Sequence, residues 1–246
     1  MALKYVTSKV LSNTEISEGI FKFYIEGNFQ VKPGQFYMLS AWEGEVLLPR
    51  PISIHETDEK GIYFLYETKG KGTKILSTLC ENDAVQLLGP LGNGFDTEAL
   101  KGKIAIVTGG MGIAPVKQLV KKISAAEVDL YCGFRGNSYG LEDMHKYTDN
   151  IYMASENGTM GFKGYITEIF RPYEYDAVLC CGPEPMMLKL VKMCREYNTP
   201  IYVSMERFMA CGIGACLVCT CSTVYGNKRT CKDGPVFLGE ELMLDA

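Results

Sequence analysis

The sequence lacks a strong excess of charge of either sign. Among its 246 residues, 25 are Lys or Arg and 29 are Asp or Glu, which leaves a net charge of −4. Binding to a phosphate backbone depends on a surplus of basic side chains. We therefore expect no nucleic-acid partner.

The sequence also lacks an export signal and a convincing membrane span. Its first ten residues carry Lys4 and Lys9 where a signal peptide has an unbroken apolar core. Residues 208–227 are uncharged and about as long as a membrane-spanning helix. However, glycines, cysteines and hydroxyl side chains make this stretch poor material for an apolar helix. We expect a cytoplasmic protein without membrane association.

Histidine is scarce, whereas cysteine is not. The only two histidines are His55 and His145, and we assign no catalytic acid or base. The ten cysteines are too few for a small disulfide-rich scaffold of this length. Because the cytoplasm keeps thiols reduced, clustered cysteines there indicate metal ligands or catalytic groups before disulfides.

The first hundred residues are rich in strand-forming side chains and turn signals. Six short runs of this kind favour an antiparallel barrel or sandwich. No convincing long helix precedes residue 100. The predicted strands are residues 5–11, 20–27, 35–42, 51–57, 61–68 and 84–91.

From Lys101 the pattern changes to strands alternating with helical segments. This alternation predicts a doubly wound parallel sheet with helices on both faces. The rhythm stops after Met205, which predicts three units: residues 1–98, 99–206 and 207–246. The predicted strands are 104–110, 128–135, 151–156, 177–183 and 201–205, and the predicted helices are 115–126, 141–147, 165–170 and 184–197.

The most specific motif is a cluster of cysteines near the end of the chain. Cys211, Cys216 and Cys219 have the spacing C-x4-C-x2-C, and Cys231 supplies a fourth thiol. This is the plant-type spacing of ligands for a [2Fe-2S] cluster. A zinc site and plain buried cysteines are the alternatives, although structural zinc sites usually have cysteine pairs with two to four residues between the two cysteines.

The other cysteines have different interpretations. Cys221 lies two residues after Cys219, so in an extended segment the two side chains point to opposite faces and only one can be a ligand. Cys80, Cys132, Cys180 and Cys194 stand singly in apolar runs, and we expect them in the core.

Two glycine turns follow apolar strands in the second unit. Gly109, Gly110 and Gly112 precede Pro115, and a second turn contains Cys181, Gly182 and Pro183. Ligands of open α/β sheets collect at the carboxyl ends of the strands, where both turns would lie. A phosphate site is therefore expected, with a tight structural corner as the alternative.

The β-rich unit has its own candidate site. The run Arg50-Pro51-Ile52-Ser53 offers a cation and a hydroxyl, and residues 70–73 offer a glycine turn with amide donors. Together they could bind a diphosphate. The alternative is a solvated strand end.

Taken together, these motifs resemble a known superfamily. A barrel with RPIS and GKGT, followed by GGMGIAP and CGPEPMM, is similar to the ferredoxin-reductase superfamily. The run SMERFMACGIGACLVCTC followed by CKDGPVF closely resembles the electron-transfer subunits of class 1B dihydroorotate dehydrogenase. The resemblance covers essentially the whole chain.

The resemblance implies three cofactor sites. It places NAD at the two glycine turns, with Cys181 near the nicotinamide, and assigns the cluster to Cys211, Cys216, Cys219 and Cys231. Family members often have Arg where this chain has Glu67, so a nearby lysine would have to compensate or Glu67 to turn away. The residues implied for FAD are Arg50, Pro51, Ile52, Ser53, Leu65, Tyr66, Glu67, Gly72 and Thr73.

The resemblance also implies a function. Electrons from dihydroorotate, oxidised in an FMN-containing catalytic subunit, would pass through [2Fe-2S] and FAD to NAD+ in pyrimidine biosynthesis, with two copies of each subunit. The alternatives are a stand-alone NAD(P)H-ferredoxin-type reductase and a zinc-stabilised nucleotide-binding regulatory module. The choice between NAD and NADP stays open, because Arg135 favours a 2′-phosphate whereas Glu142 and Asp143 disfavour it.

Overall fold

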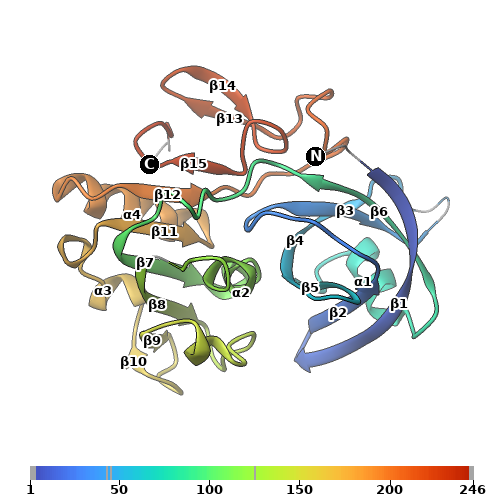
Figure 1. The fold of residues 1–246 in the computed structure, drawn as a ribbon, viewed down its shortest axis with the longest axis horizontal. Coiled ribbons are helices and arrows are strands. Elements are labelled where there is room, and N and C mark those ends of the chain that lie inside the picture. The colour runs from blue at the N-terminus through green and yellow to red at the C-terminus, as the bar shows by residue number, and fades with distance from the viewer. Residues whose placement is uncertain (1–3, 43, 45, 125, 244–246) are drawn as a thin grey trace.

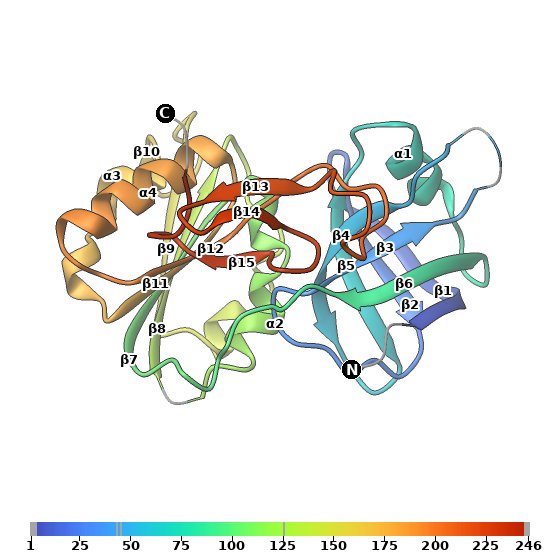
Figure 2. The same ribbon diagram turned by 90° about the horizontal axis from the view of Figure 1, so that it is seen from above.

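The computed structural model describes residues 4–42, 44, 46–124 and 126–243. A β-barrel and a sheet with helices lie side by side, and the C-terminal segment runs across both of them (Figure 1). Seen from above, this segment spans the junction between the two lobes (Figure 2). It is therefore placed where it can contact both.

Six antiparallel strands close into a barrel in the order β1-β2-β5-β4-β3-β6. Aromatic and branched side chains such as Phe23, Phe64 and Leu39 fill the interior and are fully buried. All six predicted strands are confirmed, and the closure selects the barrel over the sandwich. The strands are β1 (Lys4–Ser17), β2 (Ile20–Glu26), β3 (Phe36–Ser40), β4 (Arg50–Thr57), β5 (Gly61–Glu67) and β6 (Ala84–Leu91).

A short helix, α1 (Lys71–Thr78), follows β5, where the sequence predicted only a glycine turn. The Thr73 hydroxyl accepts hydrogen bonds from the backbone amides of Lys69, at 2.9 Å, and Gly70, at 3.2 Å. Leu76 packs its side chain into the barrel core. The hydrogen bonds to the Thr73 hydroxyl and the burial of Leu76 stabilise a helix where the sequence indicated only a turn.

The second lobe is a seven-stranded sheet in the order β10-β9-β8-β7-β11-β12-β15, parallel except for β15. Ile104 and Ile106 pack on the face with α2, whereas Ala105 and Val107 pack on the face with α3 and α4. The prediction of helices on both faces is therefore confirmed. The strands are β7 (Gly102–Gly109), β8 (Ala126–Phe134), β9 (Asn150–Ser155), β10 (Phe162–Lys163), β11 (Ala177–Cys181), β12 (Ile201–Ser204) and β15 (Val236–Leu238), and the helices are α2 (Val116–Val120), α3 (Ile166–Ile169) and α4 (Glu184–Glu196).

Two predicted helices are much shorter than their sequence pattern suggested. Helix α2 has five residues, because Ala126 already pairs with Gly102 in the sheet and the chain must turn before it. Residues 141–147 contain only a 3-10 turn, Met144–Lys146, preceded by Asp143 with a left-handed φ of 63°. Tertiary pairing and backbone conformation override the helical period here.

The C-terminal segment forms strands that the sequence did not indicate. A hairpin joins β13 (Thr220–Thr223) to β14 (Gly226–Arg229), and β15 pairs antiparallel with β12. The segment thus extends the sheet of the second lobe. Nowhere in the described residues is there a helix with the length and apolar character for a membrane crossing.

Candidate functional site

The four predicted cluster cysteines form two pairs. The backbone amide of Cys216 donates to Sγ of Cys211 at 3.4 Å, and the amide of Cys231 donates to Sγ of Cys219 at 3.4 Å. In the described part of the chain, no three His, Cys, Asp or Glu side chains are grouped to hold one metal ion. Hydrogen bonds from backbone amides to cysteine sulfurs are among the interactions that tune iron-sulfur clusters.

The outer pair lies in a nest of backbone amides. Burial raises the pKa of the Cys211 thiol, but hydrogen bonds from the amides of Cys216, Ile213 and Ala215 outweigh it and lower that pKa to about 6. Gly212 and Gly214 have left-handed φ values of 70° and 84°, which allow this wrapped loop. The loop thus supplies donors to negatively charged sulfur.

The inner pair is buried against the barrel. Cys219 and Cys231 are each 2% exposed and pack with Phe36 and Met38 of β3 and with Leu91 of β6. Burial, followed by the neighbouring Cys219 thiol, raises the pKa of Cys231 to about 12. Without a metal, Cys231 is thus a neutral thiol, and a bound metal would stabilise its thiolate.

Cys221 faces away from these pairs. Its side chain packs in the core of the second lobe, whereas the Cys219 side chain packs against β3 and β6 of the barrel. Cys132, Cys180 and Cys194 are buried as predicted, but Cys80 is exposed, so that prediction was wrong. Cys80 follows the last turn of α1, at the surface of the barrel.

Arg50, at the start of β4, is held beside Trp42. The guanidinium lies 5.5 Å from the centre of the Trp42 ring and donates to the Leu48 carbonyl oxygen at 2.5 Å. A Cβ atom at Gly72 would lie only 2.8 Å from Nε of Arg50. Arg50 and the start of α1 are thus brought together, as a diphosphate site requires. Trp42 was not among the predicted site residues, although it is the chain's only tryptophan and precedes the RPIS strand.

The remaining predicted FAD residues differ in what they expose. Pro51, Ile52 and Ser53 are half-buried along β4. Leu65 and Tyr66 are each 2% exposed and their side chains pack into cores. At these two positions a ligand could therefore contact only the backbone. The side chains of Glu67 and Lys69 form an ion pair of 2.9 Å, which supplies the compensating lysine expected for Glu67.

The two glycine turns of the second lobe interlock. A Cβ atom at Gly112 would lie 2.0 Å from the Cys181 carbonyl oxygen, and one at Gly182 would lie 2.8 Å from the Gly109 amide nitrogen. A Cβ at Gly109 would meet Pro183 at 2.9 Å. The predicted residues therefore form one compact surface at the carboxyl ends of β7 and β11. Gly110, which has a left-handed φ of 52°, belongs to the same turn. Only glycine allows this approach.

The barrel and the second lobe are joined by buried polar contacts. Glu56 of β4 forms ion pairs with Lys117 at 3.0 Å and with Lys121 at 2.6 Å. Burial raises the pKa of Glu56, but the hydrogen bonds from the two lysines lower it more, so the net shift is downward. These contacts fix the orientation of the two candidate binding surfaces.

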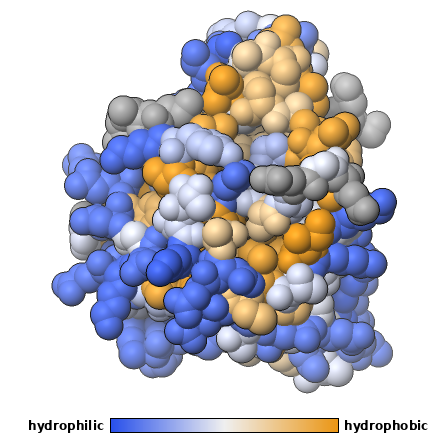
Figure 3. All heavy atoms as spheres, turned by 90° about the vertical axis from the view of Figure 1, so that its right-hand side faces the viewer, coloured by the Kyte–Doolittle hydropathy of each residue, from blue (hydrophilic) through white to orange (hydrophobic). Residues whose placement is uncertain are grey.

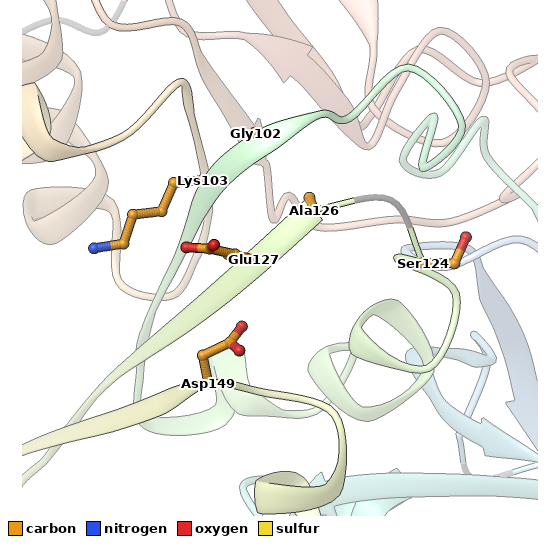
Figure 4. A pocket seen from close by; sticks show the side chains of 6 residues that line it. All are labelled: Gly102, Lys103, Ser124, Ala126, Glu127 and Asp149. Carbon is orange, nitrogen blue, oxygen red and sulfur yellow. The ribbon is translucent and has the colours of Figure 1, made fainter.

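A cavity of about 560 Å³ lies at the opposite edge of the parallel sheet (Figure 4). Two of its charged side chains are already engaged: Lys103 pairs with Asp129 at 3.3 Å, and Asp149 accepts from the Val128 amide at 2.7 Å. This is the amino-terminal edge of the strands, where ligands of such sheets do not usually bind. The cavity is lined by Gly102, Lys103, Ser124, Ala126, Glu127 and Asp149.

Comparison with known proteins agrees with this arrangement. Residues 206–243 match the family described as the iron-sulfur cluster binding domain of dihydroorotate dehydrogenase B. The electron transfer subunit of dihydroorotate dehydrogenase B (NAD(+)) from Clostridium acetobutylicum is 52% identical, with both chains fully covered. The chain belongs to this family of electron-transfer subunits. The subunit from Clostridium perfringens is 44% identical over 98% of this chain and 99% of its own.

Solved structures support the same fold. A chain from the NADH-dependent reduced ferredoxin-NADP oxidoreductase aligns with a TM-score of 0.86 and 26% identity, over 97% of this chain and 90% of that one. A ferredoxin NADP+ reductase from Neisseria gonorrhoeae, with bound FAD and NADP, aligns with a TM-score of 0.63 and 16% identity over 84% and 95%. As a dihydroorotate dehydrogenase B electron-transfer subunit, the chain is a component of an oxidoreductase.

Proposed function

We propose that this chain carries electrons from a [2Fe-2S] cluster through FAD to NAD+. Cys211, Cys216, Cys219 and Cys231 would hold the cluster. FAD binds on the barrel, and NAD+ binds at the interlocked glycine turns.

The observation that carries the proposal is the position of β3 between two of these sites. On one side, Phe36 and Met38 pack on the buried thiols Cys219 and Cys231. On the other, Phe36 pairs with Ser53 and Met38 pairs with Pro51 of β4. Neighbouring strands are about 4.8 Å apart, so a single strand separates the proposed cluster and flavin sites.

The chain's own residues bind and orient the flavin. Arg50 neutralises the diphosphate together with the amides at the start of α1, which Gly72 and Thr73 provide. Along β4, the residues Pro51, Ile52 and Ser53 line the flavin ring. On the neighbouring strand β5, the backbone of Leu65, Tyr66 and Glu67 lines it. A bound flavin accepts electrons singly and passes them on as a pair, which matches a one-electron cluster to a two-electron nicotinamide.

The second lobe positions the nicotinamide cofactor. Gly109, Gly110 and Gly112 leave room for the pyrophosphate beside the backbone, and Cys181, Gly182 and Pro183 form the neighbouring wall. Cys181 is 5% exposed, and burial raises the pKa of its thiol far above the usual value. A neutral Cys181 thiol shapes this wall without taking a proton. Orientation is sufficient for hydride transfer, so no catalytic acid or base is assigned.

The electrons come from a partner subunit that contains FMN and oxidises dihydroorotate, in an assembly with two copies of each chain. The cluster loop and the barrel both carry exposed apolar side chains. Figure 3 shows apolar residues gathered on the face that corresponds to the right-hand side of Figure 1. Such a concentration of apolar surface marks a protein interface. These side chains include Phe208, Ile213, Leu217 and Val218 of the loop and Leu47 and Leu48 of the barrel.

Each of the three predicted units binds one cofactor in this proposal. FAD belongs to residues 1–98, NAD to residues 99–206 and the cluster to residues 207–246. We place the protein in the cytoplasm, where thiols such as the four proposed cluster ligands are kept reduced.

One experiment tests this function. The anaerobically purified chain should show flavin and iron-sulfur absorption, and NADH should bleach both. A colourless sample loaded with zinc would contradict the proposal. The likeness to a ferredoxin-NADP oxidoreductase chain makes a stand-alone ferredoxin reductase the second candidate. Rapid reduction of ferredoxin by NADH and this chain alone would favour that candidate.

A further inference from the structure

The carboxyl ends of β8 and β9 form a rim beside the proposed nucleotide site. Arg135 is the first residue after β8, and Glu156 is the first residue after β9. We propose that Glu156 makes this chain select NAD over NADP by keeping a 2′-phosphate away from Arg135. The inference rests on the proposed function and names the specificity of its nucleotide site.

Sheet pairing brings these two residues next to each other. Phe134 pairs with Ser155 in the parallel register of β8 and β9. One step further, the backbone amide of Glu156 donates to the Phe134 carbonyl oxygen at 3.2 Å. The register thus continues to Arg135 and Glu156, which both have exposed side chains. Neither side chain takes part in an ion pair within the described residues.

The loop after β8 and the loop after β9 contact each other. The Ser155 side chain is fully buried, and its hydroxyl donates to the Met160 carbonyl oxygen at 2.7 Å and accepts from the Met160 amide at 2.9 Å. The Ser138 amide donates to Sδ of Met160 at 3.4 Å. A Cβ at Gly136 would lie 3.4 Å from the Asn157 side-chain nitrogen. These contacts hold Glu156 at a fixed place on the rim.

The sheet order decides which half of the dinucleotide reaches this rim. Strand β7, with its glycine turn, lies between β8 on one side and β11 on the other. The nicotinamide half is assigned to the Cys181 loop after β11. A dinucleotide whose pyrophosphate lies over the β7 turn therefore extends its adenosine half toward β8 and β9.

The charges at the rim favour a ribose with free hydroxyls. A phosphate monoester carries between one and two negative charges near neutral pH, because its second pKa is about 6. An arginine at this place attracts a 2′-phosphate, whereas a carboxylate repels it and accepts a hydrogen bond from the 2′-hydroxyl of NAD. Glu156 therefore opposes the attraction that Arg135 alone would exert.

Glu142 and Asp143, the two acidic residues considered in the sequence, are not placed to repel a 2′-phosphate at this rim. The Asp143 carboxylate pairs with Lys146 at 2.7 Å. Glu142 is exposed one residue before it, in the segment that leads into the 3-10 turn, and not at a strand end. Glu142→Gln removes the same charge as Glu156→Gln and is a matched control.

The test uses the full chain loaded with FAD and measures NADH and NADPH oxidation with ferricyanide as acceptor. We expect Glu156→Gln to raise kcat/KM for NADPH relative to NADH about tenfold, and Glu142→Gln to leave the ratio unchanged. Adding Arg135→Gln to Glu156→Gln should remove most of the gain. Dissociation constants for 2′-phospho-AMP and AMP provide a readout without turnover, and the 2′-phospho-AMP constant should fall about tenfold in Glu156→Gln.

The outcomes separate this inference from the proposed function. Wild-type protein that oxidises neither nucleotide contradicts the proposed function. Wild-type protein that oxidises NADH, together with a Glu156→Gln variant whose nucleotide preference and 2′-phospho-AMP affinity are unchanged, overturns the role of Glu156. Equal gains in Glu142→Gln and Glu156→Gln also overturn it, because they would indicate a general effect of net charge.

Discussion

Nδ1 of His55 lies 2.8 Å from the carbonyl oxygen of Ala114. His55 is on strand β4 of the barrel, and Ala114 is in the glycine turn of the second lobe. Because a carbonyl only accepts, Nδ1 carries the proton and donates it. The imidazole is fully buried, and its Nε2 has no hydrogen-bond partner among the described residues. A neutral ring thus joins the two candidate binding surfaces.

This burial makes stability depend on pH. Burial lowers the pKa of His55 from 6.5 to about 4, against the opposing effect of the Ala114 hydrogen bond. The unfolded chain therefore takes up a proton at a higher pH than the folded chain. The free energy of unfolding should fall as pH decreases from about 6.5 to about 4, by up to about 3 kcal/mol from this group.

The variant His55→Gln cannot take up this proton. In urea titrations at pH 7 and pH 5, its loss of stability on acidification should be smaller than that of the wild type by about 2 kcal/mol. His145→Gln, at an exposed position, is the control and should behave as the wild type. Identical pH dependence in His55→Gln and the wild type would show that His55 is not held neutral.

Gly72 should be required for tight FAD binding. In Gly72→Ala, the new methyl group would lie 2.8 Å from Nε of Arg50 and 3.0 Å from the Trp42 ring, so the guanidinium has to move. We expect the FAD dissociation constant to rise about tenfold, or about 1.4 kcal/mol. Gly70→Ala is the matched control in the same turn, because no atom lies within 4 Å of its Cβ. Equal FAD affinity in the two variants, measured by fluorescence titration, would argue against the Arg50 site.

Cys231 and Cys221 should differ in their effect on iron content. Cys231→Ser removes a member of the buried thiol pair and should lose or destabilise the cluster, whereas Cys221→Ser should retain it, because Cys221 packs in another core. Iron and sulfide analysis of the anaerobically purified variants measures this. The reverse result would show that the fourth ligand is Cys221.

The ion pairs of Glu56 should contribute to stability. In Glu56→Gln, the Lys117 ammonium, whose side chain is 8% exposed, keeps its burial but loses its carboxylate partner. We expect a loss of about 2 kcal/mol in the free energy of unfolding at pH 7. Glu59→Gln, exposed in the nearby turn, should change stability little. If both variants unfold alike in urea, the Glu56 ion pairs are not stabilising.

The regular parts of the fold could be predicted because short-range patterns determine them. Alternating side chains identified the barrel strands, and the period change near Lys101 identified the parallel sheet. Helix α2 was predicted too long, since the pairing of Ala126 with Gly102 is a long-range constraint that no local pattern contains. Strand β15 was missed for the same reason, because its partner β12 lies more than thirty residues earlier.

The candidate site was predicted in its components but not in its arrangement. Cysteine spacing selected the four thiols that we propose as ligands, yet only the folded chain divides them into two pairs and packs one pair on β3. The contact of Trp42 with Arg50 and the register of Arg135 beside Glu156 also depend on strand pairing. Such relationships arise from tertiary structure and leave no local signal.

The central claim is that electrons from dihydroorotate reach NAD+ through this chain. The most direct measurement mixes dihydroorotate, NAD+ and an FMN-containing dihydroorotate-oxidising subunit, with and without this chain, and follows NADH at 340 nm. We predict NADH formation only when both subunits are present, and its loss in Cys231→Ser. NADH formation at the same rate without this chain, or with a chain that holds neither iron nor flavin, would contradict the account.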